Sequence, residues 1–89
     1  MVIKKYIIND FQVEIFPSAK LNYYNSNDFY EELLDFYDEA YSKIKINFNY
    51  VESIDCSIIG KIIAFNKKVE KINCKVVISN VKNNYVKKY

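Results

Sequence analysis

Apolar residues recur along the chain at two spacings, every second residue in some stretches and every third or fourth in others. Residues 2–8 are rich in β-branched and aromatic side chains, and residues 11–16 alternate apolar and polar positions. The apolar residues of the second stretch that share one face are Phe11, Val13 and Ile15. Both patterns predict strands, and the turn-forming pair Asn9-Asp10 between them predicts a hairpin. Pro17 cannot donate to a sheet and ends the second strand, so residues 17–27 are expected to form a polar loop.

Two longer stretches repeat apolar side chains at helical spacing. The first runs from Phe29 through Ser42 behind the potential capping residues 25–28, and the second covers 57–72 after Asp55. Their apolar residues are Phe29, Leu33, Phe36, Tyr37 and Ala40 in the first and Ile58, Ile59, Ile62, Ile63, Val69 and Ile72 in the second. Acidic residues expected in the first turn of the first helix complement its dipole, namely Asp28, Glu31 and Glu32.

The remaining stretches complete an alternation of strands and helices. Residues 43–51 alternate throughout, which predicts one half-buried strand whose inner face carries Ile44, Ile46, Phe48 and Tyr50. Residues 74–79 are nearly all apolar, as expected for a strand covered on both faces, and residues 81–89 predict a short final helix. The order β-β-α-β-α-β-α implies parallel strand pairs with right-handed crossovers. The sequence therefore predicts a single α/β domain over 1–89, with a mixed sheet of about four strands, two long helices and a short C-terminal helix.

Composition narrows the functional classes. A chain of 89 residues, of which 51% are hydrophobic and 27% charged, holds one small folded core. It has no histidine and one glycine, which excludes Ser-His and Cys-His nucleophile pairs, histidine metal sites and Gly-rich phosphate loops. We therefore expect no enzymatic activity, no cofactor and no metal ion. All 13 basic residues are lysines, so specific nucleic-acid binding, which depends mostly on arginine, is not expected.

The cysteines and the first residues bear on location. Cys56 and Cys74 are not spaced as a CxxC pair. Lys4 and Lys5 interrupt the first apolar run, so no secretory signal is expected, and no stretch approaches the ~20 apolar residues of a membrane span. We expect a cytoplasmic protein with reduced thiols and no direct membrane insertion, in which Cys74 packs in the core.

The segment from Ile54 to Gly60 stands between the strand at 43–51 and the second helix. Asp55 can cap that helix, and a phosphate on the side chain that follows would meet the helix dipole and free backbone N–H groups. The stretch 44–80 resembles the STAS domain of bacterial anti-sigma factor antagonists, in which Asp-Ser-Ser-Gly-Leu-Gly joins an apolar strand to an apolar helix. The residues that match this motif in identity or type are Asp55, Ser57, Ile59 and Gly60.

Further segments extend the resemblance to residues from about 11 to 82. Lys20–Asn25 is similar to the family's Gly-x-Leu-Asp loop, and Lys75–Asn80 is similar to its strand ending in Asn. The resemblance implies partner switching, in which the domain docks an anti-sigma factor, typically a serine kinase of the histidine-kinase-like ATPase class. That kinase phosphorylates the first Ser after the Asp, and the phosphate breaks the complex. A second role within the family is that of a small STAS subunit in a lipid-transport ATPase complex.

This chain departs from the family at the phosphoacceptor position. Cys56 stands where the family has the acceptor Ser, and Ile58 replaces the first Gly, so the standard switch is expected to be lost or altered. Ser57 is a possible substitute acceptor. The residues expected to bind the partner are Asn22, Tyr23, Tyr24, Asn25, Asp55, Cys56, Ser57, Ile58, Ile59 and Lys61.

Alternative interpretations stay open for several of these residues. Asp55 is either a helix cap alone or also positions a phosphoacceptor or contacts a partner. Cys56 is either a redox-sensing thiol or a small residue without the acceptor role. Gly60 permits close helix–sheet packing, permits partner approach, or is a tolerated helix glycine. The acidic residues of the first helix are read as a solvated face rather than as a metal site. The lysines of the second helix and of the C-terminus, the latter being Lys82, Lys87 and Lys88, predict a weak basic patch that is either solvated or a nonspecific anion contact.

Overall fold

A computed structural model describes residues 3–37 and 41–82 of the chain. Its elements are β1 (Lys4–Asn9), β2 (Gln12–Phe16), β3 (Ser18–Leu21), the short 3-10 helix η1 (Tyr23–Asn25), α1 (Ser26–Tyr37), β4 (Lys43–Asn47), β5 (Tyr50–Ile54), α2 (Cys56–Glu70) and β6 (Lys75–Ser79). The main sheet has the order β1-β2-β4-β6, with β1 antiparallel to β2 and the other pairs parallel. A second, two-stranded parallel sheet pairs β3 with β5.

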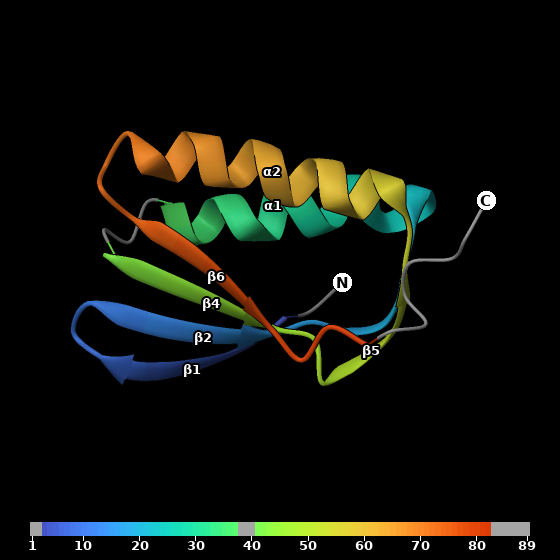
Figure 1. Cartoon of the computed structure of the whole chain (residues 1–89), viewed down its shortest axis with the longest axis horizontal. Helices are drawn as coiled ribbons and strands as arrows, with labels where there is room; N and C mark the ends of the chain where they lie inside the picture. Colours follow the sequence, from blue (N-terminus) through green and yellow to red (C-terminus); the bar gives the residue numbers. More distant parts are fainter. Residues whose placement is uncertain (1–2, 38–40, 83–89) are drawn as a thin grey trace.

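Both helices lie on the same face of the main sheet (Figure 1). The core fills the space between these layers, because the apolar sides of β2, β4, α1 and α2 all point into it. Its largest fully buried side chains include Phe29 from α1, Phe48 from the segment after β4, and Phe65 from α2. Cys74 is also buried, as expected. The predicted α/β domain with a mixed four-stranded sheet and two long helices is therefore confirmed.

The stretch predicted as one strand, 43–51, is instead two strands in two different sheets. The side chain of Asn47 accepts a hydrogen bond from the N–H of Asn49 at 2.9 Å, and the N–H of Val51 bonds to the carbonyl of Phe48 at 3.0 Å. These local bonds turn the chain, a common effect of an asparagine side chain that bonds the backbone two residues on. As a consequence Tyr50, expected on the inner face, is 59% exposed.

The loop expected over 17–27 is largely structured. Its first part forms β3, which pairs with β5, and its second part forms η1. Ala19 in β3 has a left-handed backbone, with φ of 66°, next to an irregularity in the pairing with β5. Alternation along the chain did not predict β3, because its partner is β5. This strand leaves the main sheet at the turn after β4.

Three smaller expectations are also corrected. The strand β6 is at the edge of the sheet and is not covered on both faces, so Ile78 is 42% exposed. Phe11 is exposed because it lies in the turn before β2. The helix α1 begins at Ser26, which leaves Asp28 as the acidic residue of its first turn, while Glu31 and Glu32 lie further along.

Two predictions fall wholly or partly outside the described residues. Most of the C-terminal helix expected over 81–89 lies beyond residue 82, and Ala40 lies in the gap between 37 and 41. Among the described residues, no helix is both long and apolar enough to cross a membrane.

Candidate functional site

Asp55 links the start of α2 to a segment more than thirty residues earlier in the chain. It is the N-cap of α2, and its Oδ1 accepts hydrogen bonds from the N–H of Ser57 at 3.0 Å and of Ile58 at 3.4 Å. The hydroxyl of Ser57 donates to the same oxygen. The other oxygen, Oδ2, accepts from the N–H of Tyr23 at 2.9 Å. One carboxylate therefore satisfies backbone donors from two separate segments.

The loop that meets Asp55 is held by its own side chains. Asn22 and Asn25 form a reciprocal cap around η1, in which each side-chain oxygen accepts from a backbone N–H at 2.9 Å. The amide of Asn25 also donates to the carbonyl of Lys20 at 2.8 Å, and the hydroxyl of Ser26 donates to the carbonyl of Tyr23 at 2.9 Å. The loop is thus built to hold one shape. Ser26 belongs to the run of potential capping residues 25–28, and its hydroxyl bonds a carbonyl of the loop.

The β3–β5 pair explains why these two segments meet. The last residues of the two strands, Leu21 and Ile54, are partners in the parallel ladder. The carboxyl ends of parallel strands lie at the same edge of a sheet, which is where α/β proteins usually place binding sites. The chain therefore continues from β3 into residues 22–25 and from β5 into the start of α2 side by side. Figure 1 shows the two segments next to each other at one end of the helical layer.

Exposed side chains gather at this end of the molecule. Tyr24 is 92% exposed and Tyr23 is 72% exposed, with their rings edge to face and 5.8 Å between centroids. Cys56, the first residue of α2, is exposed, and Ile59 is partly exposed one turn later. Lys61 lies further along α2, where its ammonium is 5.4 Å from the ring centroid of Tyr30 in α1. An exposed aromatic pair with polar neighbours is typical of a protein-binding surface.

One of the predicted partner-binding residues does not lie on this surface. Ile58 is fully buried in the core, where it anchors the first turn of α2 to the sheet. The helical period places Ile58 toward the sheet and Ile59 away from it, so only Ile59 reaches the surface. Eight of the other predicted residues lie on the two segments that the Tyr23–Asp55 bond joins, namely Asn22, Tyr23, Tyr24, Asn25, Asp55, Cys56, Ser57 and Ile59, whereas Lys61 lies beside Tyr30 of α1.

Gly60 does not have the packing role that the sequence suggested. It is exposed, and a Cβ atom built on it would meet no neighbouring atom within 4 Å. Close helix–sheet packing therefore does not require a glycine at this position. Partner approach and a tolerated helix glycine are the interpretations that remain.

The hydrogen bonds around Asp55 also set its charge. The hydroxyl of Ser57, and after it the backbone N–H groups of Tyr23, Ile58 and Ser57, hold the pKa of Asp55 below its ordinary value. These donors favour the ionised form, because each of them bonds to a carboxylate oxygen. The start of α2 therefore carries a negative charge directly beside the thiol of Cys56.

The two cysteines lie at opposite ends of α2. The helix has 15 residues, so the two residues are separated by about 20 Å, well beyond the reach of a disulfide. Cys74 is buried, and this burial raises the pKa of its thiol. Cys56 has no resolving cysteine within its own described chain, which weakens the redox interpretation.

The acidic side of α1 shows no arrangement typical of a metal site. Residues 3–37 and 41–82 contain no group of three or more histidine, cysteine or carboxylate side chains able to hold a metal ion. Burial, and the nearby charges of Asp35 and Asp28, raise the pKa of Glu32. This side of the helix matches the solvated face expected from the sequence, with Glu32 as its least exposed carboxylate.

Comparison with known proteins gives a family and a set of structural relatives. The model of the STAS domain matches residues 3–88. A proposed anti-sigma factor antagonist of Thermotoga maritima superposes with a TM-score of 0.81 and 26% identity, over 91% of this chain and 69% of that one. The anti-sigma factor antagonist SpoIIAA of Bacillus, known in phosphorylated and unphosphorylated forms, gives 0.73 and 14%, over 93% and 76%. Part of the protein Mglu gives 0.73 and 12%, over 90% and 20%. No curated protein sequence matches the chain.

Proposed function

Because the chain belongs to the STAS domain family, we propose that it is a regulatory binding module without catalytic turnover, which acts as an antagonist of an anti-sigma factor. The observation that carries this proposal is the bond between the N–H of Tyr23 and Asp55, which fixes the aromatic loop against the start of α2. The relatives SpoIIAA and the Thermotoga maritima protein, described as anti-sigma factor antagonists, support it.

The docking face consists of exposed and half-buried residues from the two segments that this bond joins. Its centre is the ring pair of Tyr23 and Tyr24, and its rim is polar. Aromatic anchors of this kind carry much of the binding energy of protein interfaces, and a polar rim completes them. The residues of the docking face are Asn22, Tyr23, Tyr24, Asn25, Asp55, Cys56, Ser57, Ile59 and Lys61. The partner we propose is an anti-sigma factor that is also a serine kinase of the histidine-kinase-like ATPase class.

The switch by phosphorylation is altered in this chain. The first position of α2 holds the thiol of Cys56, which is not the usual acceptor of a serine kinase. The next hydroxyl, on Ser57, is already engaged as a donor to Asp55. A phosphate there would add roughly −1.5 to −2 charges beside a carboxylate that the site keeps ionised. We therefore expect docking without release by phosphorylation at residue 56.

Co-purification is the experiment that tests the proposed function. The tagged full chain, expressed in its own host, is expected to bring down an anti-sigma factor with a kinase domain, identified by mass spectrometry. Tyr24→Ala should lose that partner, and Tyr24→Phe, which keeps the ring, should retain it. A partner captured equally by all three chains would place the interface outside the docking face.

The thiol of Cys56 at the usual phosphoacceptor position also favours a second candidate function. A docking face that cannot be phosphorylated at its usual position suits a permanent complex as well as a switched one. The alternative is therefore a small STAS subunit of a transport complex of the lipid-transport ATPase type. Recovery of a permease and an ATPase in the co-purification, instead of an anti-sigma factor, would select this alternative.

Catalysis is tested separately. The isolated domain is expected to hydrolyse nucleotides only at the background rate, because the chain has no histidine base and no Gly-rich loop to hold phosphates. Hydrolysis that persists through repurification and disappears in Asp55→Ala would overturn this part of the proposal.

A further inference from the structure

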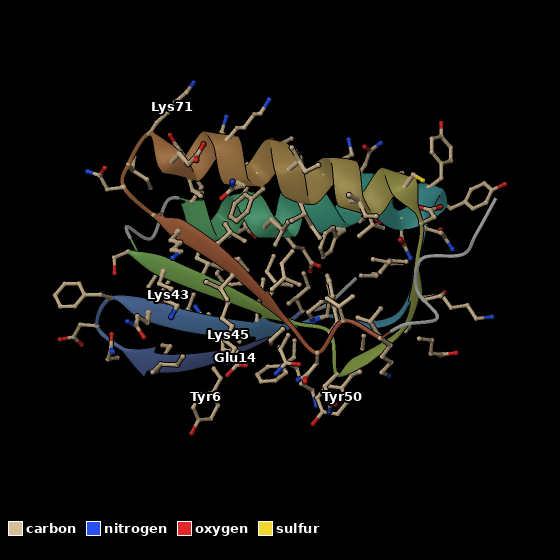
Figure 2. All side chains as sticks on the ribbon, in the orientation of Figure 1. Tyr6, Glu14, Lys43, Lys45, Tyr50 and Lys71 are labelled. Atoms are coloured by element: carbon tan, nitrogen blue, oxygen red, sulfur yellow. The ribbon has the colours of Figure 1, made fainter. Side chains whose placement is uncertain are left out.

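The main sheet has a second face, opposite the helices, that the docking face does not use. Residues on this open sheet face alternate with the buried residues of the same strands, because successive side chains of a strand point to opposite sides. The pairing of Glu14 with Lys45, and of Tyr6 with Glu14, places these side chains on it together. Figure 2 shows Tyr6, Lys43 and Lys45 along the main sheet and Tyr50 beside its end, below β5.

One half of the open sheet face is basic. Lys43 and Lys75 are direct partners on the neighbouring strands β4 and β6, and Lys45 follows two residues along β4. Like charges in register on adjacent strands cost stability, so such a pair attracts an anion. Glu14 is the sole carboxylate within the four strands of this sheet. It lies 3.8 Å from the ammonium of Lys45 and accepts from the amide of Asn47 at 2.9 Å.

The other half of the open sheet face is aromatic. Tyr6 is 66% exposed, and Tyr50 packs its ring 6.0 Å from that of Phe16, measured between centroids. Lys4, Phe16 and Tyr50 line a shallow hollow of about 350 Å³. The position of Tyr50 depends on the turn at Asn47–Asn49, which moves it out of the core and next to Phe16. The rings and most of the ammonium groups therefore occupy neighbouring halves of one face.

The charges of the helical layer have the opposite sign on the side formed by α1. This helix carries four carboxylates and no lysine, namely Asp28, Glu31, Glu32 and Asp35. A negatively charged chain is thus repelled by α1 and attracted by the sheet. The difference in charge between α1 and the main sheet is therefore larger than the net charge of +2 suggests.

We propose that the open sheet face binds single-stranded nucleic acid without sequence preference. A single strand offers phosphates to Lys43, Lys45 and Lys75 and unpaired bases to the rings of Tyr6 and Tyr50, a combination typical of sequence-tolerant binding. A four-stranded sheet with aromatic residues on its open face stacks two or three bases in other proteins. The proposed contacts go to phosphates and to the faces of the bases, in keeping with the absence of specific recognition expected from the sequence.

Two other anionic partners fit the face less well. A DNA duplex offers phosphates, but its bases are already stacked and leave the rings unused. An anionic lipid surface offers charge over its whole plane, whereas this face separates its rings from most of its ammonium groups. The open sheet face is also distinct from the docking face, so this proposal and the proposed function can fail independently.

The test is fluorescence anisotropy with a labelled twelve-nucleotide oligothymidine at low and physiological salt. The wild-type chain is expected to bind it at least tenfold more tightly than a duplex of the same length. Tyr50→Ala should weaken binding about tenfold, while Tyr50→Phe, which keeps the ring, should bind like the wild type. Lys43→Glu combined with Lys75→Glu should weaken binding more than tenfold and reduce the salt dependence. Lys71→Glu, at the end of α2 in the helical layer, is the charge control and should change little (Figure 2).

Several outcomes would overturn the proposal. Equal binding of duplex and single strand, with no effect of Tyr50→Ala, would show that the face attracts any polyanion by charge alone and would overturn the proposal. Binding that none of the sheet variants weakens would place the site elsewhere, and the absence of binding at low salt would refute it. Vesicles containing phosphatidylserine are assayed in parallel, and sheet-dependent binding to vesicles alone would identify a membrane as the occupant. Circular dichroism of each variant confirms that a lost signal is not a lost fold.

Discussion

At the scale of single residues, Asp55 decides how the start of α2 is held. Its carboxylate caps the helix and also bonds the backbone of the loop at 22–25 to the start of that helix. Ser57 and three backbone N–H groups bond to its charged form, so its pKa lies lower in the folded than in the unfolded chain. The stabilisation is therefore complete above the unfolded pKa of about 3.9 and is lost as the pH falls through the folded value.

The lowered pKa of Asp55 predicts how the stability of two variants of this residue depends on pH. Asp55→Asn keeps one capping oxygen but loses the charge and the second acceptor, so it should lower the free energy of unfolding at neutral pH and remove this residue's share of the loss of stability in acid. Asp55→Ala removes the cap and should lower the free energy of unfolding by about 1 kcal/mol at pH 7. Urea unfolding between pH 2 and pH 7 measures both effects. A wild-type and an Asp55→Asn chain with the same acid profile would contradict the prediction.

Cys56 carries the second prediction at this scale. Wild-type protein incubated with its kinase and ATP is expected to take up no phosphate at residue 56, and Cys56→Ser should restore an acceptor, because Ser is nearly isosteric and leaves the cap unchanged. Cys56→Asp should weaken docking by a few kcal/mol, since it places an unpaired charge in the interface. Mass spectrometry locates the phosphate, with Ser57→Ala added to Cys56→Ser as the control. Phosphate on Ser57 of the wild type would show that the switch is intact.

At the scale of elements, a glycine and an alanine occupy positions that suit the other residue. Gly60 lies inside α2 with open space around its Cβ position, and Ala19 lies in β3 with a left-handed backbone. Gly60→Ala should raise the free energy of unfolding by about 1 kcal/mol, because alanine loses less backbone entropy in a helix. Ala19→Gly should raise it by about 0.5–1 kcal/mol, since glycine tolerates the left-handed region.

Urea unfolding of both variants, with partner binding measured alongside, distinguishes a structural role of Gly60 from a role in partner binding. Stability gained without loss of binding in Gly60→Ala would mean that the glycine is a tolerated helix residue. Stability gained together with weaker docking would mean that the partner approaches α2 closely at this point. A loss of stability in Gly60→Ala would contradict the open surroundings of its Cβ.

At the scale of the whole molecule, the two layers share a single small core. Phe65 is fully buried between α2 and the sheet, so Phe65→Ala should lower the free energy of unfolding by about 3–5 kcal/mol. A domain of this size has about 5–10 kcal/mol in total, and the variant should therefore be close to unfolding at 37 °C. Thermal unfolding followed by circular dichroism checks this, with the exposed Ile63→Ala as the control. A loss below 1 kcal/mol would show that Phe65 contributes little to the stability of the core.

The sequence by itself determined the parts of this protein that depend on neighbours along the chain. The alternation of apolar and polar residues predicted β2, the helical spacing predicted α1 and α2, and the position of Asp55 before an apolar helix predicted its capping role. These features follow from periodicity and local hydrogen bonding, which need no knowledge of distant segments. The motif from Asp55 to Gly60, together with the order of strands and helices, carried the resemblance to the STAS domain.

Only the tertiary structure decided what distant segments do together. The turn at Asn47–Asn49 sends β5 to pair with β3, and this pairing both creates a strand from the expected loop and brings Tyr23 to Asp55. The same turn exposes Tyr50, which alternation alone placed in the core. The order of the strands leaves β6 at an edge and Lys43 beside Lys75. Such pairings depend on which strands are neighbours, and residue spacing along one strand carries no information about that choice.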